Sequence, residues 1–154
     1  MRGDPSFVSS REREIDLEAV REFADGLMQL VWVTDDAGCR EYFNPAWSDF
    51  TGLSLAQSVG NGWQLALHPA DLDPILQRWE EHRGRGLPYG VSFRFRSADD
   101  EYRLFTGAMF PIRDASGAVR KWIGICDESG AQARADIAAW GPAEDWSDWA
   151  DAAR

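Results

Sequence analysis

The amino-acid sequence predicts an α+β fold, in which a five-stranded antiparallel sheet carries short helices on one face. The first observation is the stretch 89–126, where three strand-like runs are separated by two turns rich in Asp, Ser and Gly. The second is an earlier pair of short strand-like runs at 30–33 and 40–43, which indicates a hairpin. A helical insert separates the two groups without β-α-β alternation. We therefore expect an antiparallel sheet, closed by pairing of the hairpin with the last strand.

The run at 91–96 indicates that one face of this sheet is buried. Phe93 and Phe95 alternate with Arg94 and Arg96, so the aromatic rings share one face of the strand and the arginines share the other. The arginines make the outer surface polar, whereas the aromatic face needs a cover of helices. What lies beneath that cover decides whether the domain holds a ligand.

An amphipathic helix is predicted at 11–25, with Ser9 and Ser10 as caps and acidic residues in the first turn, where the helix dipole favours them. Its apolar stripe either packs on the domain's own sheet or forms a dimer interface, and the sequence leaves both readings open. The residues expected in the dimer interface are Ile15, Val20, Phe23 and Leu27.

Between the two groups of strands the sequence predicts three helical segments. Asn44 is a cap for a brief helix at 46–50, and Ser54 is a cap for a turn at 55–58. The longest helix is expected at 69–83 and ends at the glycines that follow it. Its buried stripe is expected to contain Leu72, Ile75, Leu76 and Trp79.

Charge and composition exclude several classes of function. A formal net charge of −10 argues against a nucleic-acid partner, because phosphate binding needs a basic patch. The two cysteines and two histidines show no metal-ligand spacing, so no metal site is expected. The sequence contains neither a signal-peptide pattern nor an apolar run of about 18 residues. A cytoplasmic protein without a membrane span is therefore expected.

Several short motifs follow one another along the predicted domain. The segment 44–47 reads NPAW and is followed by Thr51-Gly52. Trp63 is followed by the segment 68–71, which reads HPAD at the start of the long helix. Further motifs lie in the last three strands, at Phe93-Arg94, Glu101-Tyr102-Arg103, Ile112-Arg113-Asp114 and Gly117. Together these motifs resemble the PAS domain family, in particular its Trp-rich bacterial sensory subtype, which has an N-x-x-W…T-G segment and a W…H-P-x-D entry to the long helix.

The resemblance extends over residues 30–127 and divides the chain into three parts. These are a lead-in with the amphipathic helix (1–28), the PAS-like domain (29–127) and an acidic tail (128–154). The resemblance implies a five-stranded antiparallel sheet whose concave face, with the short helices, encloses a core able to hold a ligand. The tail contains three tryptophans that either dock on the domain or anchor a partner: Trp140, Trp146 and Trp149.

The sequence departs from the family pattern at three places. Asp99-Asp100 replaces the usual Asp-Gly of one strand-to-strand turn, which should still form but less freely. Leu104 stands where the subtype often has Trp, which makes one side of the core smaller. The usual Asp-Ile-Thr ending is present only as 127–129 (DES), which weakens the prediction of a signal relay through the C-terminus.

The residues expected around a ligand pocket come from the helical insert and the inner face of the sheet. Asn44 offers an amide group, and Trp47 and Trp63 offer stacking surfaces for a non-covalent flavin, although both indoles also suit a filled core. Cys126 is expected to point inward and to behave as a small hydrophobic residue. The full set is Asn44, Trp47, Trp63, Leu76, Trp79, Phe93, Phe95, Trp122 and Cys126.

Cofactor chemistry finds little support in the sequence. Gly62 stands where the light-oxygen-voltage branch of the family has its reactive cysteine, so formation of a photoadduct is not expected. His68 begins a helix, and a structural role is expected for it rather than haem ligation. His82 is expected on the surface. The cofactor is therefore left unknown, with none expected by default and a non-covalent flavin or haem as the exceptions.

No set of residues in the sequence argues for catalysis, because no nucleophile has a base placed beside it. The leading hypothesis is a non-catalytic PAS module in signal transduction that senses a small ligand or mediates protein interaction. It would form a homodimer through the N-terminal helix and act on a downstream signalling protein. The alternatives are a ligand-free interaction module with a packed core, and a haem or flavin redox sensor.

Overall fold

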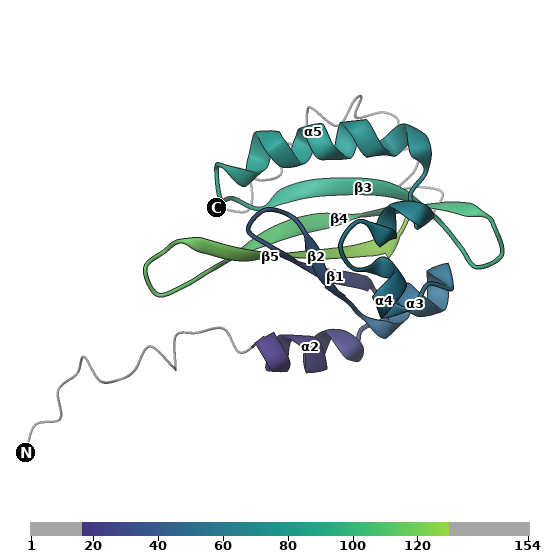
Figure 1. Cartoon of the computed structure of the whole chain (residues 1–154), viewed down its shortest axis with the longest axis horizontal. Helices are drawn as coiled ribbons and strands as arrows, with labels where there is room; N and C mark the ends of the chain where they lie inside the picture. The colour runs from purple at the N-terminus through teal and green to yellow at the C-terminus, as the bar shows by residue number, and fades with distance from the viewer. Residues whose placement is uncertain (1–16, 130–154) are drawn as a thin grey trace, which may run out of the picture.

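Five antiparallel strands form one sheet in the spatial order β2-β1-β5-β4-β3 (Figure 1). The structure is a computed structural model and describes residues 17–129 of the chain. The predicted closure of the sheet is confirmed, because β1 of the first hairpin pairs with β5, the last strand, and Trp32 lies opposite Gly124. The strands are β1 (Leu30–Asp35), β2 (Arg40–Phe43), β3 (Tyr89–Arg96), β4 (Tyr102–Arg113) and β5 (Val119–Glu128).

Helices lie on both faces of this sheet (Figure 1). The long helix α5 and the short helices before it cover the inner face, which confirms the predicted α+β class, and α2 lies against the outer face. Within residues 17–129, no helix has the length and apolar composition needed to cross a membrane. Ile15 and the three tryptophans of the tail lie outside the described residues. The helices are α2 (Leu17–Asp25), α3 (Pro45–Thr51), α4 (Leu55–Ser58), the 3₁₀ turns η2 (Gly62–Ala66) and η3 (Pro69–Asp71), and α5 (Leu72–Arg83).

Capping residues position the two short helices α3 and α4. Asn44 begins α3, where its side-chain oxygen accepts a hydrogen bond from the backbone N–H of Trp47 at 3.4 Å. Ser54 begins α4 in a capping box with Gln57, in which each side chain accepts a hydrogen bond from the other's backbone N–H. The two helices then meet inside the fold, because the indole N–H of Trp47 donates to the Ser58 hydroxyl at 2.9 Å.

The inner face of the sheet forms an aromatic core. Period-two alternation along β3 and β5 directs Phe93, Phe95 and Trp122 inward, as predicted. Trp32 fits beside them because Gly124 lies opposite it, and a Cβ atom at position 124 would come within 2.1 Å of the indole. Trp32 meets Phe93 edge to face at 5.4 Å between ring centroids, a favourable geometry for aromatic pairs.

The outer face of β1 and β5 is covered by α2, but only part of the predicted apolar stripe faces the sheet. Ala24 is buried and Leu27 is partly buried against Val31, whereas Phe23, in the predicted stripe, is 70% exposed. The small side chain of Ala24 lets the helix approach the sheet closely. Its carbonyl also accepts a hydrogen bond from the Asn44 amide at 2.9 Å, which fixes the rotation of the helix.

The turn between β3 and β4 forms despite the departure at Asp99-Asp100. The backbone N–H of Ser97 donates to the Glu101 carbonyl at 2.8 Å and closes the turn. Asp100 adopts a φ of 63°, in the left-handed region that favours glycine and that Asp tolerates better than most residues. The predicted turn is therefore present, with backbone strain at Asp100.

Candidate functional site

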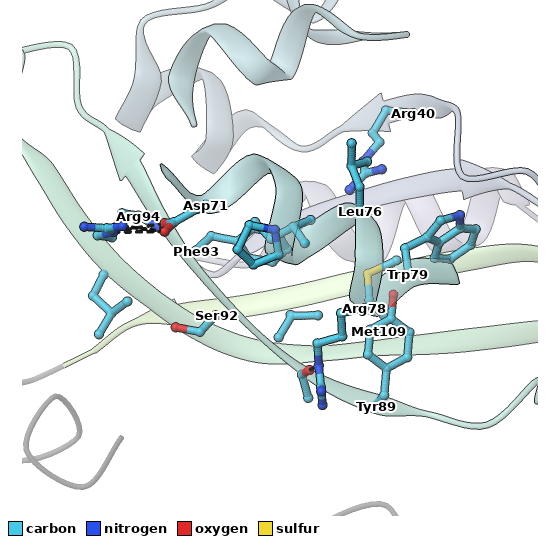
Figure 2. Close-up of a pocket in the computed structure, with 15 residues that line it drawn as sticks. Arg40, Asp71, Leu76, Arg78, Trp79, Tyr89, Ser92, Phe93, Arg94 and Met109 are labelled. Carbon is cyan, nitrogen blue, oxygen red and sulfur yellow. Dashed lines mark hydrogen bonds and ion pairs between the residues drawn. The ribbon is translucent and has the colours of Figure 1, made fainter. Parts of the chain in front are cut away.

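A cavity of about 200 Å³ lies between helix α5 and strand β3, which is an edge strand of the sheet. Figure 2 shows the labelled side chains gathered there, with the Asp71–Arg94 pair at one end and Trp79 and Tyr89 toward the other. Much of its lining is apolar or aromatic, with a few polar groups, which is the usual composition of a small-molecule site. The apolar side chains of the lining include Ile75, Trp79, Val91, Phe93 and Met109.

The structure separates the predicted pocket residues into two groups. Leu76, Trp79 and Phe93 line the cavity. Leu76 is 41% exposed, so its predicted place in the buried stripe of the long helix is wrong, because it lies at the rim of the cavity. The other six do not line this cavity and fill the core or hold it together: Asn44, Trp47, Trp63, Phe95, Trp122 and Cys126.

Two of these six have clear structural roles. The Asn44 side-chain oxygen accepts from the backbone N–H of Val31 at 3.0 Å, and its amide donates to the carbonyls of Ala24 and Gln29, each at 2.9 Å. Asn44 therefore ties α2, β1 and α3 together and leaves no amide group for a ligand. Trp47 is fully buried, and its ring stacks on Phe43 at 4.5 Å between centroids.

Arg40 also lines the cavity, although the sequence pattern does not predict it there. Its guanidinium lies over the ring of Trp63, 4.0 Å from the centroid, and Nη1 donates to the Gly38 carbonyl at 2.9 Å. Its Nε is buried and has no hydrogen-bond partner. Burial lowers the pKa of Arg40 to about 10, so the side chain stays charged at neutral pH.

A β-bulge places Arg40 on the inner face of the sheet. Val33 lies opposite Tyr42, but the next residue, Thr34, lies opposite Arg40, so Glu41 is the extra residue of the bulge. Without this shift, strict alternation would put Arg40 on the outer face with Tyr42. The bulge is a feature of strand pairing, which explains why a period-two pattern missed Arg40.

Arg78 and Tyr89 line the same cavity, and His82 packs against Tyr89 outside the lining. The Arg78 Nε donates to the Gly90 carbonyl at 2.8 Å, and burial lowers the pKa of Arg78. The ring of Tyr89 is buried beside it, and burial raises the pKa of Tyr89 well above its usual value. His82 stacks on Tyr89 at 4.6 Å between centroids, and burial lowers the pKa of His82. The expected surface position of His82 is wrong, because this stacking half-buries the imidazole.

The segment before α5 is fastened to β3 by Asp71 and Arg94. The Asp71 carboxylate accepts from the Arg94 backbone N–H at 2.9 Å and from the Arg94 guanidinium, with Nη2 at 2.5 Å. This hydrogen bonding raises the pKa of Arg94. His68 caps the same segment, since its Nδ1 accepts from the Ala70 N–H at 3.1 Å. The structural role expected for His68 therefore agrees with its geometry.

The described residues do not fit the family's flavin or haem chemistry. A Cβ atom at position 62 would lie 1.8 Å from the Gln57 carbonyl oxygen, so this backbone has no room for an adduct-forming cysteine there. His68 does not line the cavity and faces Tyr102, with 4.7 Å between ring centroids. The cavity of about 200 Å³ is below the roughly 300 Å³ at which typical drug-sized sites begin. Across residues 17–129, no group of three metal-ligating side chains is placed to hold a metal ion.

The chain resembles short parts of longer curated proteins. It is 28% identical over 100 residues to the uncharacterized protein y4lL of Sinorhizobium fredii, which covers 65% of this chain and 12% of that protein. It is 26% identical over 118 residues to the peroxide stress-activated histidine kinase mak1 of Schizosaccharomyces pombe, which covers 70% of this chain and 7% of that protein. The chain thus spans only a small part of either relative's length.

A solved structure and a family model both match this chain. The crystal structure of a PAS domain from Colwellia psychrerythraea matches with a TM-score of 0.61 and 18% identity, over 73% of this chain and 96% of that one. At this identity the likeness shows the fold alone. The family model described as PAS fold matches residues 40–126, which is more than half of the chain. The chain therefore belongs to the PAS-fold family.

Proposed function

We propose that this chain is a non-catalytic sensory module of signal transduction, which binds a small molecule in the cavity between α5 and β3. The observation that carries the proposal is the cavity itself, about 200 Å³ in volume, with an aromatic lining and a few inward polar groups. The relative mak1 is a histidine kinase named for its activation by peroxide stress, and a sensory role for this chain is consistent with that relationship.

The chemistry of the lining supports binding rather than catalysis. Among the described lining residues there is no histidine or cysteine, so a nucleophile with an adjacent imidazole base cannot be assembled there. The carboxylate in the lining belongs to Asp71, which is already paired with the guanidinium of Arg94. A bound ligand would change the position of α5 relative to β3, since the cavity separates these two elements.

A screen of metabolites by thermal shift tests this proposal. Ile75→Trp adds a large ring to a residue that lines the cavity, so it should abolish the stabilisation that a hit gives to the wild type. Leu65→Trp is the matched control, because Leu65 is exposed and does not line the cavity. Both variants must unfold cooperatively to be compared. The absence of any hit, or a hit that stabilises Ile75→Trp as strongly as the wild type, would favour the alternative of a ligand-free interaction module.

We also propose that the module pairs with a second copy of itself through α2. Phe23 is 70% exposed, and Met28, which follows the helix, is 95% exposed, so the chain presents large apolar side chains outside its own core. Of the predicted interface, Val20 is partly exposed, while Leu27 is already packed on the sheet. Phe23→Glu should reduce the molar mass measured by light scattering, and Glu22→Lys is the control, since Glu22 is another exposed residue of the same helix. A monomeric wild type would overturn this proposal.

A further inference from the structure

The cavity concentrates positive charge inside an acidic protein. The whole chain carries a formal net charge of −10, yet the titratable side chains of the lining include three arginines and a single carboxylate. That carboxylate, Asp71, is held by Arg94 at one end of the cavity (Figure 2). The remaining charged side chains of the lining are therefore Arg40 and Arg78, both positive.

Arg40 is the side chain in this space whose positive charge is least compensated by neighbouring groups. Its guanidinium contacts the Gly38 carbonyl and the face of Trp63, both of which are uncharged, and no ion pair joins it to a carboxylate of the described chain. A charged side chain removed from water without an ionic partner is destabilising, and its Nε–H has no acceptor. An anion in the cavity would supply the missing negative charge beside Arg40.

Tyr89 adds a second polar group near Arg40. Its ring is buried, and among residues 17–129 its hydroxyl has no hydrogen-bond partner. Both Arg40 and Arg78 act electrostatically on this hydroxyl and favour its ionised form, although burial outweighs them and raises the pKa of Tyr89. At neutral pH the hydroxyl is therefore protonated and able to donate to an anion.

The other lining residues define the rest of the ligand. Trp79, Met109 and Val91 offer apolar surface, which an inorganic anion such as sulfate would leave without a partner. A cavity of about 150 Å³ holds a benzene-sized molecule, so about 200 Å³ suits one ring or a short chain with an acidic group. The shape and the charge together thus describe an amphipathic anion.

We propose that the ligand is a small organic carboxylate, with its carboxylate paired to Arg40 and Tyr89 and its apolar body against Trp79 and Met109. This inference rests on the proposed function, because it names the class of ligand for the same cavity. A carboxylate accepts two parallel hydrogen bonds from a guanidinium, which makes Arg a better partner for it than for a neutral amide.

The test compares benzoate, benzamide and sulfate by calorimetric titration of the purified chain. Benzoate should bind at least about tenfold more tightly than benzamide, because its hydrogen bonds are charge-assisted. Arg40→Met should abolish this preference, and Arg40→Lys, which keeps the charge, should retain part of it. Arg120→Met is the control, since it removes an exposed arginine that does not line the cavity.

The ligand-free proteins give an independent readout. Arg40→Met should unfold at or above the temperature of the wild type, because it removes a partly buried charge that has no ionic partner among the described residues. Equal binding of benzoate and benzamide, or sulfate binding as tightly as benzoate, would overturn the carboxylate inference and leave the sensory proposal standing. If neither aromatic probe binds, the inference fails. If, in addition, no compound of the metabolite screen binds, the sensory proposal fails with it.

Discussion

The Asp71 carboxylate joins the start of helix α5 to strand β3 by holding both the backbone N–H and the guanidinium of Arg94. These two elements are also the walls of the cavity. The H-P-A-D segment at 68–71 thus has a physical role in this chain, since His68 caps the turn and Asp71 ties it to the sheet. One ion pair therefore sets the distance between the cavity walls at one end.

Asp71→Ala should lower the free energy of unfolding by about 1–2 kcal/mol, measured by chemical denaturation. The expected loss lies toward the low end for hydrogen bonds to a charged group, because Arg94 is 43% exposed and Asp71 is 19% exposed. Arg83→Ala, which breaks an exposed pair with Glu80, is the control and should change stability by less than about 0.5 kcal/mol. Equal losses in the two variants would show that the Asp71–Arg94 pair does not fasten α5.

Gly62→Ala should destabilise the domain by about 2–3 kcal/mol, as an overpacking substitution does when the backbone cannot move away. The added Cβ would lie 1.8 Å from the Gln57 carbonyl oxygen, which belongs to helix α4. Gly84→Ala is the control, because nothing lies within 4 Å of its Cβ position and its φ is −69°. A Gly62→Ala variant as stable as Gly84→Ala would contradict the packing described here and reopen the adduct chemistry of this position.

Only one of the two cysteines should react with a thiol reagent in the folded protein at pH 8. Cys39 is exposed, whereas Cys126 is buried in the core, and burial raises the pKa of its thiol well above the usual value. Because the reactive species is the thiolate, Cys126 should react only after unfolding in denaturant. A Cys39→Ser variant should show no rapid reaction, and a rapid second equivalent in the wild type would place Cys126 at the surface.

Asp100→Gly should stabilise the domain by up to about 1 kcal/mol, because glycine adopts the left-handed backbone conformation without a clash at Cβ. Asp100 has a φ of 63° in the turn between β3 and β4. Asp99→Gly is the control, since Asp99 does not have a positive φ, and glycine there should be neutral or destabilising. Both free energies come from the same denaturant series. A loss of stability in Asp100→Gly would show that the aspartate side chain matters more to the turn than its backbone strain.

The sheet was predictable from the sequence because its signals are local. The turn residues between the strands determine where each strand begins and ends. The alternation around Phe93 and Phe95 determines which side chains face the core. The pairing of β1 with β5 then follows from closing the sheet. The caps at Asn44 and Ser54 were predictable for the same reason, since each involves residues close along the chain.

The site was less predictable because its geometry depends on contacts between distant segments. Arg40 reaches the cavity through a bulge against β1, and Trp63 covers it from a later helical turn. The rotation of α2 depends on the contact between Ala24 and Asn44, which an apolar stripe does not reveal. Five of the expected pocket residues fill the core, because side chains on the inner face pack first on one another, and the sixth, Asn44, holds three elements together by hydrogen bonds.

NMR of the chain with ¹³C-labelled methionine methyl groups tests most directly whether the cavity between α5 and β3 binds a small molecule. Met109 lines the cavity, while Met28 is 95% exposed outside it and serves as an internal control. On titration with benzoate or a hit from the metabolite screen, we predict a saturable shift of the Met109 methyl resonance with Met28 unchanged. A Met109 resonance that stays in place while the compound binds, or a shift confined to Met28, would show that the compound binds outside the cavity.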